Sequence, residues 1–421
     1  MKKYLLILTL PFFFLPSLIA QYNDFNKEDP TAPYLNTITN AAPFLLISPD
    51  SRAGGMGDMG VSTSPDNYCQ HHNPAKYIFN KDIFGIGIAY SPWLSGLVND
   101  ITLAYLSTFW KVTDNDAIAA SLRFFSFGEI TFTKEDGVKI TDVSPNEFAL
   151  DFTYARKLSK IVSMAVTPRF MYSNLTQGYY DPRQGIDMKA GIAGAVDISL
   201  FVDKTFIHYR SSIKSSRLMF GANISNIGNK VSYTVGNTQR DFLPCNLRLG
   251  LSYELNLDDY NRIGVNVEVG KLLVPTPPVG EKDTALNIWK YYGNGKDLNK
   301  INPIEGIARS FYDAAGGYKW NSRGCFNEEM REVIWSFGIE YSYRDILFVR
   351  TGTFLESQYK GNRKFATVGA GIKYNIFAID VSYLFTLTNQ HHPLENTLRF
   401  TLTFMLESFN KDRIKTQKRF N

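Results

Sequence analysis

Apolar and polar residues alternate with a period of two along most of the chain from about residue 82 onward. In the segment 396–406, every second residue from Leu398 to Leu406 is leucine or phenylalanine, and the positions between them begin with Arg399 and Thr401. The segment 332–344 alternates in the same way, with serine or glutamate opposite Trp, Phe, Ile and Tyr. Side chains on a β-strand point to opposite faces in turn, so this pattern predicts strands with one apolar and one polar face.

The number and length of these segments predict how the strands are arranged. About fourteen can be counted, most of them about ten to thirteen residues long, which is enough to cross a bilayer when tilted. A soluble sheet also alternates, but its apolar face needs a covering layer, and the chain has no amphipathic helix pattern that could provide one. We therefore predict an all-β fold, a transmembrane antiparallel β-barrel with lipid outside and polar groups inside. The predicted strands are 82–91, 99–111, 116–128, 146–158, 160–173, 187–201, 217–227, 244–256, 260–273, 333–344, 346–356, 364–374, 377–387 and 396–406.

The connections between the predicted strands alternate in length. Outer-membrane barrels have short periplasmic turns and longer extracellular loops, so the alternation predicts a barrel with both chain ends periplasmic. The connection 202–216 is the exception, because it is long where a short one is expected. The short connections include 112–115, 159, 258–259, 345 and 375–376, and the long ones include 129–145, 174–186, 228–243, 357–363, 388–395 and a very long loop at 274–332.

The N-terminal part of the chain differs from the barrel segments. Lys2 and Lys3 precede an apolar run to Ala20, which predicts a signal peptide over residues 1–20. Beyond it the chain has no stretch of eighteen or more apolar residues, so a helical membrane span is excluded. Residues 21–81 carry scattered prolines and a glycine cluster, and we expect an irregular plug or hatch in the lumen; a periplasmic tail is the alternative. The barrel is expected over 82–406, followed by a basic periplasmic tail at 407–421.

Composition adds little that changes this picture. Aromatic residues make up 14% of the chain, which fits the aromatic girdles of membrane barrels, although soluble sheets favour them too. The net charge of +5 is small and scattered, so nucleic acid is not an expected partner. Cys69, Cys245 and Cys325 are too few and too widely spaced for a disulfide framework. One pair could form in an oxidising compartment, but three thiols are the expectation.

Three motifs suggest chemistry and are better explained without it. The stretch 55–60 matches a dinucleotide fingerprint, but it lacks the strand before and the helix after, so it predicts only a tight backbone path. His71–His72 and His391–His392 are adjacent pairs, and neighbouring side chains on a strand point to opposite faces, so neither pair is a ready chelate. No nucleophile, base and orienting group can be assembled around the histidines. We therefore expect no enzyme activity, no cofactor and no metal.

Charged and polar residues also occur at the inward positions of the predicted strands. They could line a solute path, but buried charges need partners, so pairing with each other and with the plug is favoured. These residues are Asp151, Arg169, Arg248, Glu254, Asn266, Glu268, Glu340, Asp380 and Arg399.

Several long motifs resemble one family. The stretch 43–58 (PFLLISPDSRAGGMGD), followed by TSPD at 63–66 and NPAK at 73–76, resembles the N-terminal signature of the PorV family, also called LptO, of the type IX secretion system. The Asn-Pro-Ala element is also similar to the hatch of FadL-like outer-membrane barrels. Further matching motifs lie at 92–94, 125–132, 271–278 and 394–400, whereas Ala315 stands where the family has proline. Within these motifs the expected plug residues are Arg52, Gly55, Gly57, Asp58, Asn73 and Pro74.

The resemblance implies a role in protein secretion at the cell outer membrane. Members of this family accept secreted cargo proteins with a C-terminal secretion domain from the outer-membrane translocon and bring them to the cell-surface sortase, which attaches them to lipopolysaccharide. A FadL-like transporter of hydrophobic ligands and a lipid A O-deacylation factor are the alternatives. Because the cargo would meet the extracellular loops, we expect it at the loop 274–332, whose aromatic residues are of the kind that interfaces favour. These are Trp289, Tyr291, Tyr292, Phe311, Tyr312 and Trp320.

Overall fold

The structure, a computed structural model, describes most of the chain outside its two ends. The described residues are 35–93, 100–133, 139–178, 180–181, 186–208, 213–236, 240–283, 288–317, 322–387 and 397–407. The predicted signal peptide and the residues 408–421 of the predicted tail lie outside these ranges.

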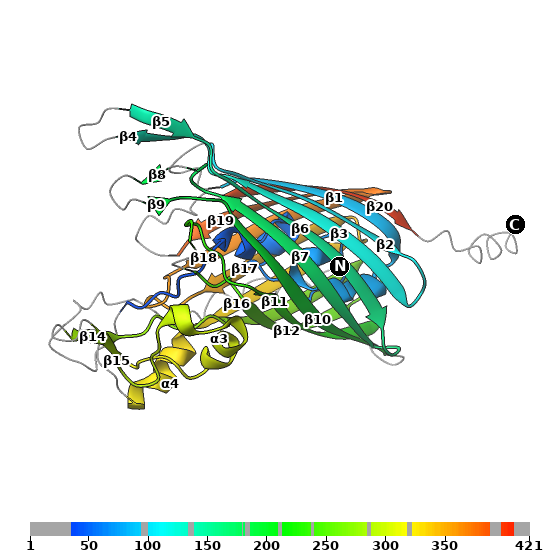
Figure 1. The fold of residues 1–421 in the computed structure, drawn as a ribbon. Helices are drawn as coiled ribbons and strands as arrows, with labels where there is room; N and C mark the ends of the chain where they lie inside the picture. The colour runs from blue at the N-terminus through cyan, green and yellow to red at the C-terminus, as the bar shows by residue number, and fades with distance from the viewer. Residues whose placement is uncertain are drawn as a thin grey trace, which may run out of the picture.

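Within the described residues, fourteen antiparallel strands close into a barrel (Figure 1). Each barrel strand pairs with the barrel strand that precedes it along the chain, and β1 pairs with β20 to close the sheet. The fold and the strand number predicted from the alternation are thus confirmed. The barrel strands are β1 (Asp82–Pro92), β2 (Thr102–Lys111), β3 (Asp116–Ser126), β6 (Asn146–Lys157), β7 (Val162–Asn174), β10 (Gly191–Ile207), β11 (Ser215–Gly228), β12 (Asn246–Asn256), β13 (Asn261–Leu272), β16 (Val333–Tyr343), β17 (Leu347–Leu355), β18 (Lys364–Tyr374), β19 (Phe377–Thr386) and β20 (Leu398–Glu407).

The connection between β10 and β11 was the exception in the predicted pattern, and the structure removes it. Both strands run beyond their apolar alternation, and Val202 to Ile207 pair with Ser215 to Phe220, so the connection shrinks to 208–214. Inside the barrel, Arg217 Nε donates to Asp203 Oδ1 at 2.8 Å across this extension. The prediction was wrong here because backbone pairing carries the strands past the point where the apolar pattern stops.

The two ends of the barrel differ in the size of their connections. Short turns join the strands at one end, whereas the long connections at the other end contain elements of their own that project together from the rim (Figure 1). The sequence pattern predicted only plain loops for these connections. They hold the two-stranded sheets β4 (Ile130–Thr133) with β5 (Lys139–Val143), β8 (Tyr180–Asp181) with β9 (Ile186–Asp187) and β14 (Gly280–Asp283) with β15 (Ile288–Tyr291), and the helices η3 (Leu298–Lys300), α3 (Pro303–Arg309) and α4 (Ser322–Arg331).

The barrel wall turns its apolar side chains outward. On β7, for example, Met164, Val166 and Phe170 are exposed, whereas the residues between them, such as Thr167 and Arg169, are buried in the interior. A belt of exposed apolar side chains is unstable in water and is the surface that hydrocarbon covers in a membrane barrel. Among the described residues, no helix combines the length and the apolar character needed to cross a membrane.

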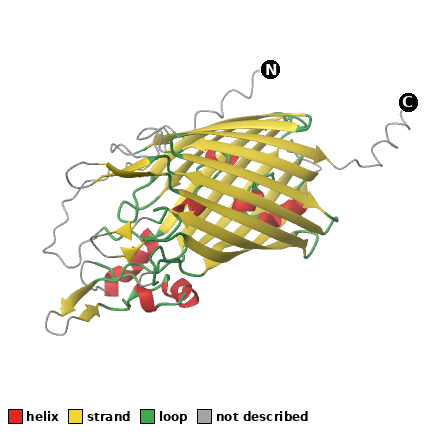
Figure 2. Ribbon diagram, turned by 45° about the horizontal axis from the view of Figure 1, so that its top comes forward, coloured by secondary structure: helices red, strands yellow, loops and turns green. Residues whose placement is uncertain are grey.

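The segment before β1 runs through the interior of the barrel and forms a plug. Its short helices lie inside the ring of strands (Figure 2), and they are η1 (Pro43–Leu46), α1 (Ser51–Gly54), α2 (Cys69–His72) and η2 (Pro74–Phe79). At the long-loop end, the amide of Asn36 donates to Tyr359 O at 3.2 Å. At the short-turn end, Lys111 Nζ donates to Asn80 O at 2.9 Å. The described part of the plug therefore spans the lumen from one rim to the other.

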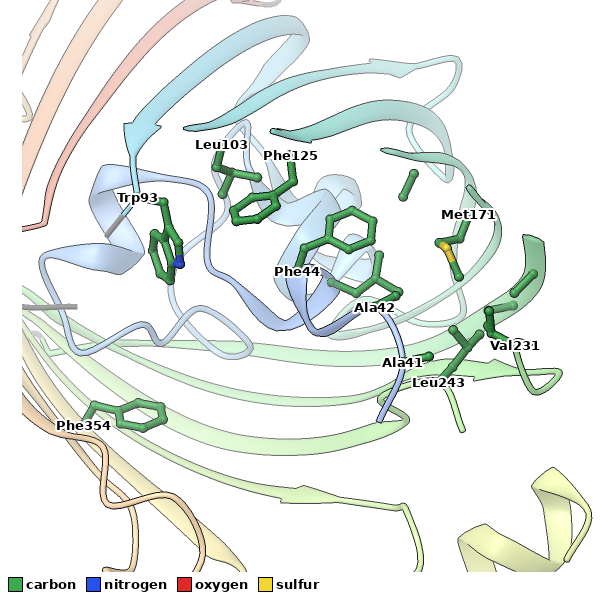
Figure 3. Close-up of a cluster of buried hydrophobic side chains, with 14 of the residues drawn as sticks. Ala41, Ala42, Phe44, Trp93, Leu103, Phe125, Met171, Val231, Leu243 and Phe354 are labelled. Carbon is green, nitrogen blue, oxygen red and sulfur yellow. The ribbon is translucent and has the colours of Figure 1, made fainter. Parts of the chain in front are cut away.

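An apolar cluster holds the plug where it enters from the long-loop end. Phe44 of η1 packs beside Phe125 and Leu103 of the wall, as Figure 3 shows, with the two phenyl ring centroids 6.4 Å apart. Phe44 and Leu45 are buried, and Ile47 is half-buried against the same cluster. Burial of this run is what its apolar character predicts for a segment in the lumen.

Candidate functional site

Arg52 is the centre of the polar contacts between plug and wall. Its Nε and Nη2 donate to the two carboxylate oxygens of Glu340 on β16, each at 3.0 Å, and its Nη1 donates to Asp66 Oδ2 at 2.8 Å. Glu340 also accepts from Arg350 Nε at 2.7 Å, and Arg350 pairs with Asp380. The planar guanidinium matches a carboxylate with two parallel hydrogen bonds, so this geometry fixes both position and orientation of the plug.

A tight turn at Gly57 and Asp58 follows α1. Gly57 has φ of +74°, and a Cβ there would lie 2.4 Å from the carbonyl oxygen of Thr353. Its amide donates to Thr367 Oγ1 at 2.9 Å, and Asp58 pairs with Arg399 on β20. The glycine-rich stretch therefore provides the tight backbone path that the sequence predicted, pressed against the wall. Gly55 also packs closely against the wall, because a Cβ on Gly55 would lie only 3.0 Å from the Cα of Gly369.

The Asn73–Pro74 element holds the other end of the plug. The Asn73 side chain donates to Val61 O and to Leu200 O on β10, both at 2.9 Å, and its Oδ1 accepts from the amide of Ala75. Pro74 is buried at the start of η2, where its missing N–H costs nothing. One asparagine thus ties the plug backbone to itself and to the wall.

The wall side of this interface was not predicted from the sequence. Glycines at inward positions of the strands lie where the plug approaches most closely, and a Cβ at Gly221 would lie 2.0 Å from the carbonyl oxygen of Val61. Glycine inside a strand often marks such a close approach, so glycines in the inward phase of the alternation were the available signal. Those in contact with the plug are Gly85, Gly87, Gly221, Gly250, Gly338, Gly352 and Gly369.

The inward-facing charges that sequence analysis singled out lie in the lumen and are paired. Arg169 Nε donates to Asp151 Oδ1 at 2.6 Å and also pairs with Asp197. Other members pair across the wall or with the plug, including Arg248 with Glu268, Arg217 with Glu254 and Arg399 with Asp58, while Asn266 donates to Gly338 O. The contacts therefore show these charges paired with each other and with the plug, which is the alternative that the sequence favoured.

The first histidine pair lies in the plug, as the sequence predicted for residues 21–81, and it belongs to a short helix. His71 and His72 close α2, with their ring centroids 4.6 Å apart. His72 Nε2 lies 2.9 Å from Asp50 Oδ1, and His71 Nδ1 lies 2.5 Å from Arg123. Both imidazoles therefore take part in contacts within the lumen. The second pair, His391–His392, lies outside the described residues.

Two cavities lie at opposite ends of the plug. One of about 460 Å³ opens toward the short-turn end, with the charged residues Arg52, Asp66, Arg217 and Glu254 among its lining residues. The other, of about 120 Å³, lies toward the long-loop end beside Leu46, Trp93 and Phe354. Plug residues line both cavities.

The connection 273–332 forms a separate unit on the long-loop rim, which we call the outer loop module. A set of buried charges, Lys271, Glu328, Glu329, Glu332 and Lys360, fixes it to the barrel, and we call this set the anchor cluster. Lys360 Nζ lies 2.8 Å from Glu328 and 2.9 Å from Glu332, and Lys271 Nζ lies 2.5 Å from Glu332 and 3.0 Å from Glu329. Four of these five side chains are at most 10% exposed and Glu329 is 11% exposed, so the pairs are shielded from water.

The anchor cluster also reaches the plug and a neighbouring carboxyl. Asn36 Nδ2 donates to Glu328 Oε1 at 3.3 Å, which joins the start of the described plug to the module. Asp313 lies in the same region, accepting from the amide of Thr276. Burial and the nearby carboxylates of Glu329 and Glu332 raise the pKa of Asp313 to about 7.

The aromatic residues predicted to meet a partner lie on this module. Trp289 is 54% exposed and stacks almost parallel to Tyr291, with ring centroids 6.4 Å apart. Phe311 and Tyr312 are exposed beyond α3, and Asn294 Nδ2 donates to Tyr312 O at 3.0 Å, linking that stretch to the end of the β14–β15 hairpin. The amide of Tyr292 donates to Val279 O. Trp320 lies outside the described residues. The five described residues thus belong to one module that projects from the rim (Figure 1).

A closed antiparallel barrel with an apolar outer surface and a polar, plugged interior defines a β-barrel protein of the bacterial outer membrane. Comparison with protein-family models matches residues 31–279, more than half of the chain, to "Type IX secretion system protein PorV". The chain therefore belongs to the PorV family.

Comparison with solved structures gives distant matches. The toluene transporter TbuX of Ralstonia pickettii is 11% identical, with a TM-score of 0.45 and coverage of 86% of this chain and 98% of that chain. The toluene transporter TodX of Pseudomonas putida is 11% identical, with a TM-score of 0.43 and coverage of 88% and 98%. A Pseudomonas aeruginosa FadL homologue is also 11% identical, with a TM-score of 0.40 and coverage of 89% and 100%. A search of curated protein sequences finds no match.

Proposed function

We propose that this protein is a non-enzymatic binding component of the type IX secretion system. It accepts secreted cargo that carries a C-terminal secretion domain from the outer-membrane translocon, and it presents that cargo to the cell-surface sortase for attachment to lipopolysaccharide. The observation that carries the proposal is the outer loop module, which displays exposed aromatic side chains and is fixed to the rim by buried ion pairs. Membership of the PorV family supports the assignment to secretion.

The plugged lumen supports a binding platform over a conduit. The plug is held on several sides of the wall, by Arg52 on β16, Asp58 on β20 and Asn73 on β10. Moving it would expose several buried charges without partners, each at a cost of several kcal/mol. A transporter of hydrophobic ligands would have to meet that cost, whereas a platform that binds through its outer loops leaves the plug in place.

The geometry of the module suits the capture of a protein partner. Aromatic side chains supply large contact area at low cost in conformational entropy, and a handful of them dominates most protein interfaces. The anchor cluster keeps the module in one position, so less ordering is needed when a partner binds. Trp289 and Phe311 are each more than half exposed and are the strongest candidate contacts among the described residues.

The test replaces these two side chains in the full-length protein in cells. Trp289→Ala with Phe311→Ala should reduce the cargo that co-purifies with the barrel by at least about tenfold, because interface aromatics often contribute more than about 1 kcal/mol each. The matched control is Tyr374→Ala, which removes an aromatic side chain that is 78% exposed at the short-turn end. Equal cargo recovery from the double variant, the control and the unchanged protein would refute the proposal.

A further inference from the structure

Helix α4 of the outer loop module has two distinct faces. Glu328 and Glu329 take part in the anchor cluster and turn toward the barrel rim. Phe326 and Met330 lie two positions to either side of Glu328, which places them roughly 160° to 200° around the helix from it. They are one turn apart from each other and form a single apolar stripe that faces away from Glu328, with Glu329 at its edge, roughly 60° around the helix from Phe326. Phe326 is 71% exposed and Met330 is 47% exposed.

The stripe leads directly into the lipid-facing wall. Only Glu332, buried in the anchor cluster, separates α4 from the start of β16 at Val333. Trp335 and Phe337 are the next outward side chains, both exposed, with nearly parallel rings whose centroids are 6.3 Å apart. Tryptophan near the end of a membrane strand is typical of the membrane–water interface. The end of α4 therefore stands just beyond the edge of the apolar belt, at the outer end of β16.

The position of the module agrees with this placement. In both ribbon views the helices of the module lie at the long-loop rim and to one side of the barrel mouth, not over its centre (Figures 1 and 2). A helix there has the outer leaflet of the membrane as its nearest apolar surface. The same helix carries polar groups toward the rim and apolar groups away from it, which is the pattern of helices that lie at a membrane interface.

We propose that the Phe326–Met330 stripe of α4 inserts into the outer leaflet of the outer membrane and anchors the outer loop module to the lipid surface. The partner is lipid, because the stripe continues the surface that lipid already covers on β16. The contact holds the module from its outer side, while the anchor cluster holds it from the barrel side. This goes beyond cargo binding and does not depend on it.

Spin labelling of the full-length barrel in lipid bilayers tests the proposal. In a Cys325→Ser background, a nitroxide is placed at Phe326→Cys or Met330→Cys, and its collisions with oxygen, which concentrates in lipid, are compared with those of a water-soluble nickel chelate. Labels at both positions should favour oxygen over the chelate by several-fold, approaching a label at Leu402→Cys, which faces lipid on β20. The remaining cysteines, Cys69 and Cys245, are buried and so shielded from labelling.

The matched control is Asn327→Cys, an exposed position on the same helix one residue from Phe326. A label there should collide mainly with the nickel chelate. Equal accessibility to the chelate at positions 326, 327 and 330 would overturn the proposal, because the stripe would then face water. Protection of 326 and 330 from both reagents would also overturn it, since that result indicates a protein contact instead of lipid.

Discussion

Lys360 holds the outer loop module to the barrel through two carboxylates, and its replacement by methionine should release the module. Its ammonium group lies 2.8 Å from Glu328 and 2.9 Å from Glu332, and its side chain is 4% exposed. In Lys360→Met, Glu332 keeps Lys271, but Glu328 loses the one cation with which it is paired among the described residues. Removing one partner of a buried ion pair costs about 3 kcal/mol or more, because a charge is left buried and uncompensated.

The free energy lost in Lys360→Met can be measured as a change in the rate of proteolytic cleavage. A loss of about 3 kcal/mol raises the population of the opened module by about a hundredfold, since 1.4 kcal/mol corresponds to a factor of about ten. Limited proteolysis of the folded barrel reports this population directly when the module opens and closes faster than it is cleaved. We therefore expect cleavage within residues 273–332 to be about a hundredfold faster in Lys360→Met, while the barrel itself stays resistant.

The matched control is Lys296→Met in the same module. Lys296 pairs with Glu305 at 2.7 Å, but the side chains are 39% and 30% exposed. Exposed pairs contribute at most about 1 kcal/mol, so this variant should change the cleavage rate by less than about fivefold. Similar rates for the two variants would refute the assignment of the anchor cluster as the element that fixes the module.

Two further predictions concern the plug and the pH response of the module. Gly57→Val should lower the yield of folded barrel, because a Cβ at this position meets the carbonyl of Thr353. The yield is measured by the heat-dependent mobility of the barrel on gels. Gly178→Val is the control, since Gly178 also has positive φ but has open space around it. A normal yield from Gly57→Val would contradict the close packing of the turn. Burial raises the pKa of Asp313 to about 7 and also raises the pKa of Glu329. These carboxyls therefore take up protons when the module docks onto the barrel rim, and this docking weakens as pH rises from about 4 to about 7. Module cleavage should therefore become faster over that range and less so in Asp313→Asn; a flat or falling profile in the unchanged protein would count against this.

The barrel could be predicted from the sequence because its signal is local. Lipid outside and polar groups inside impose the same alternation on each strand, so segments such as 364–374 and 377–387 could be located from their own residues. The prediction failed where backbone pairing continues without that alternation, as in β10 and β11 beyond the apolar pattern. It also missed the hairpins and helices of the long connections, which lie outside the repeating environment of the wall.

For the plug, the backbone path could be predicted from the sequence, whereas its contacts with the wall could not. Its glycines and prolines predicted an irregular path, and Gly57 does adopt positive φ. Its contacts could not be predicted, because Arg52 meets Glu340 from 288 positions away and Asp58 meets Arg399 from 341 positions away. The wall glycines could have been recognised from their inward positions in the strands. The sequence does not indicate which plug residue packs against each of them.

The sequence by itself determined a membrane barrel of about fourteen strands, an internal N-terminal segment and an aromatic outer loop, because alternation, turn residues and composition act over a few neighbouring positions. Only the tertiary structure decided how the lumen charges pair, how the module is fixed by Lys271 and Lys360, and which side chains of α4 remain exposed. Those features depend on distances between residues far apart in the chain, and closure of the barrel sets these distances for all strands at once.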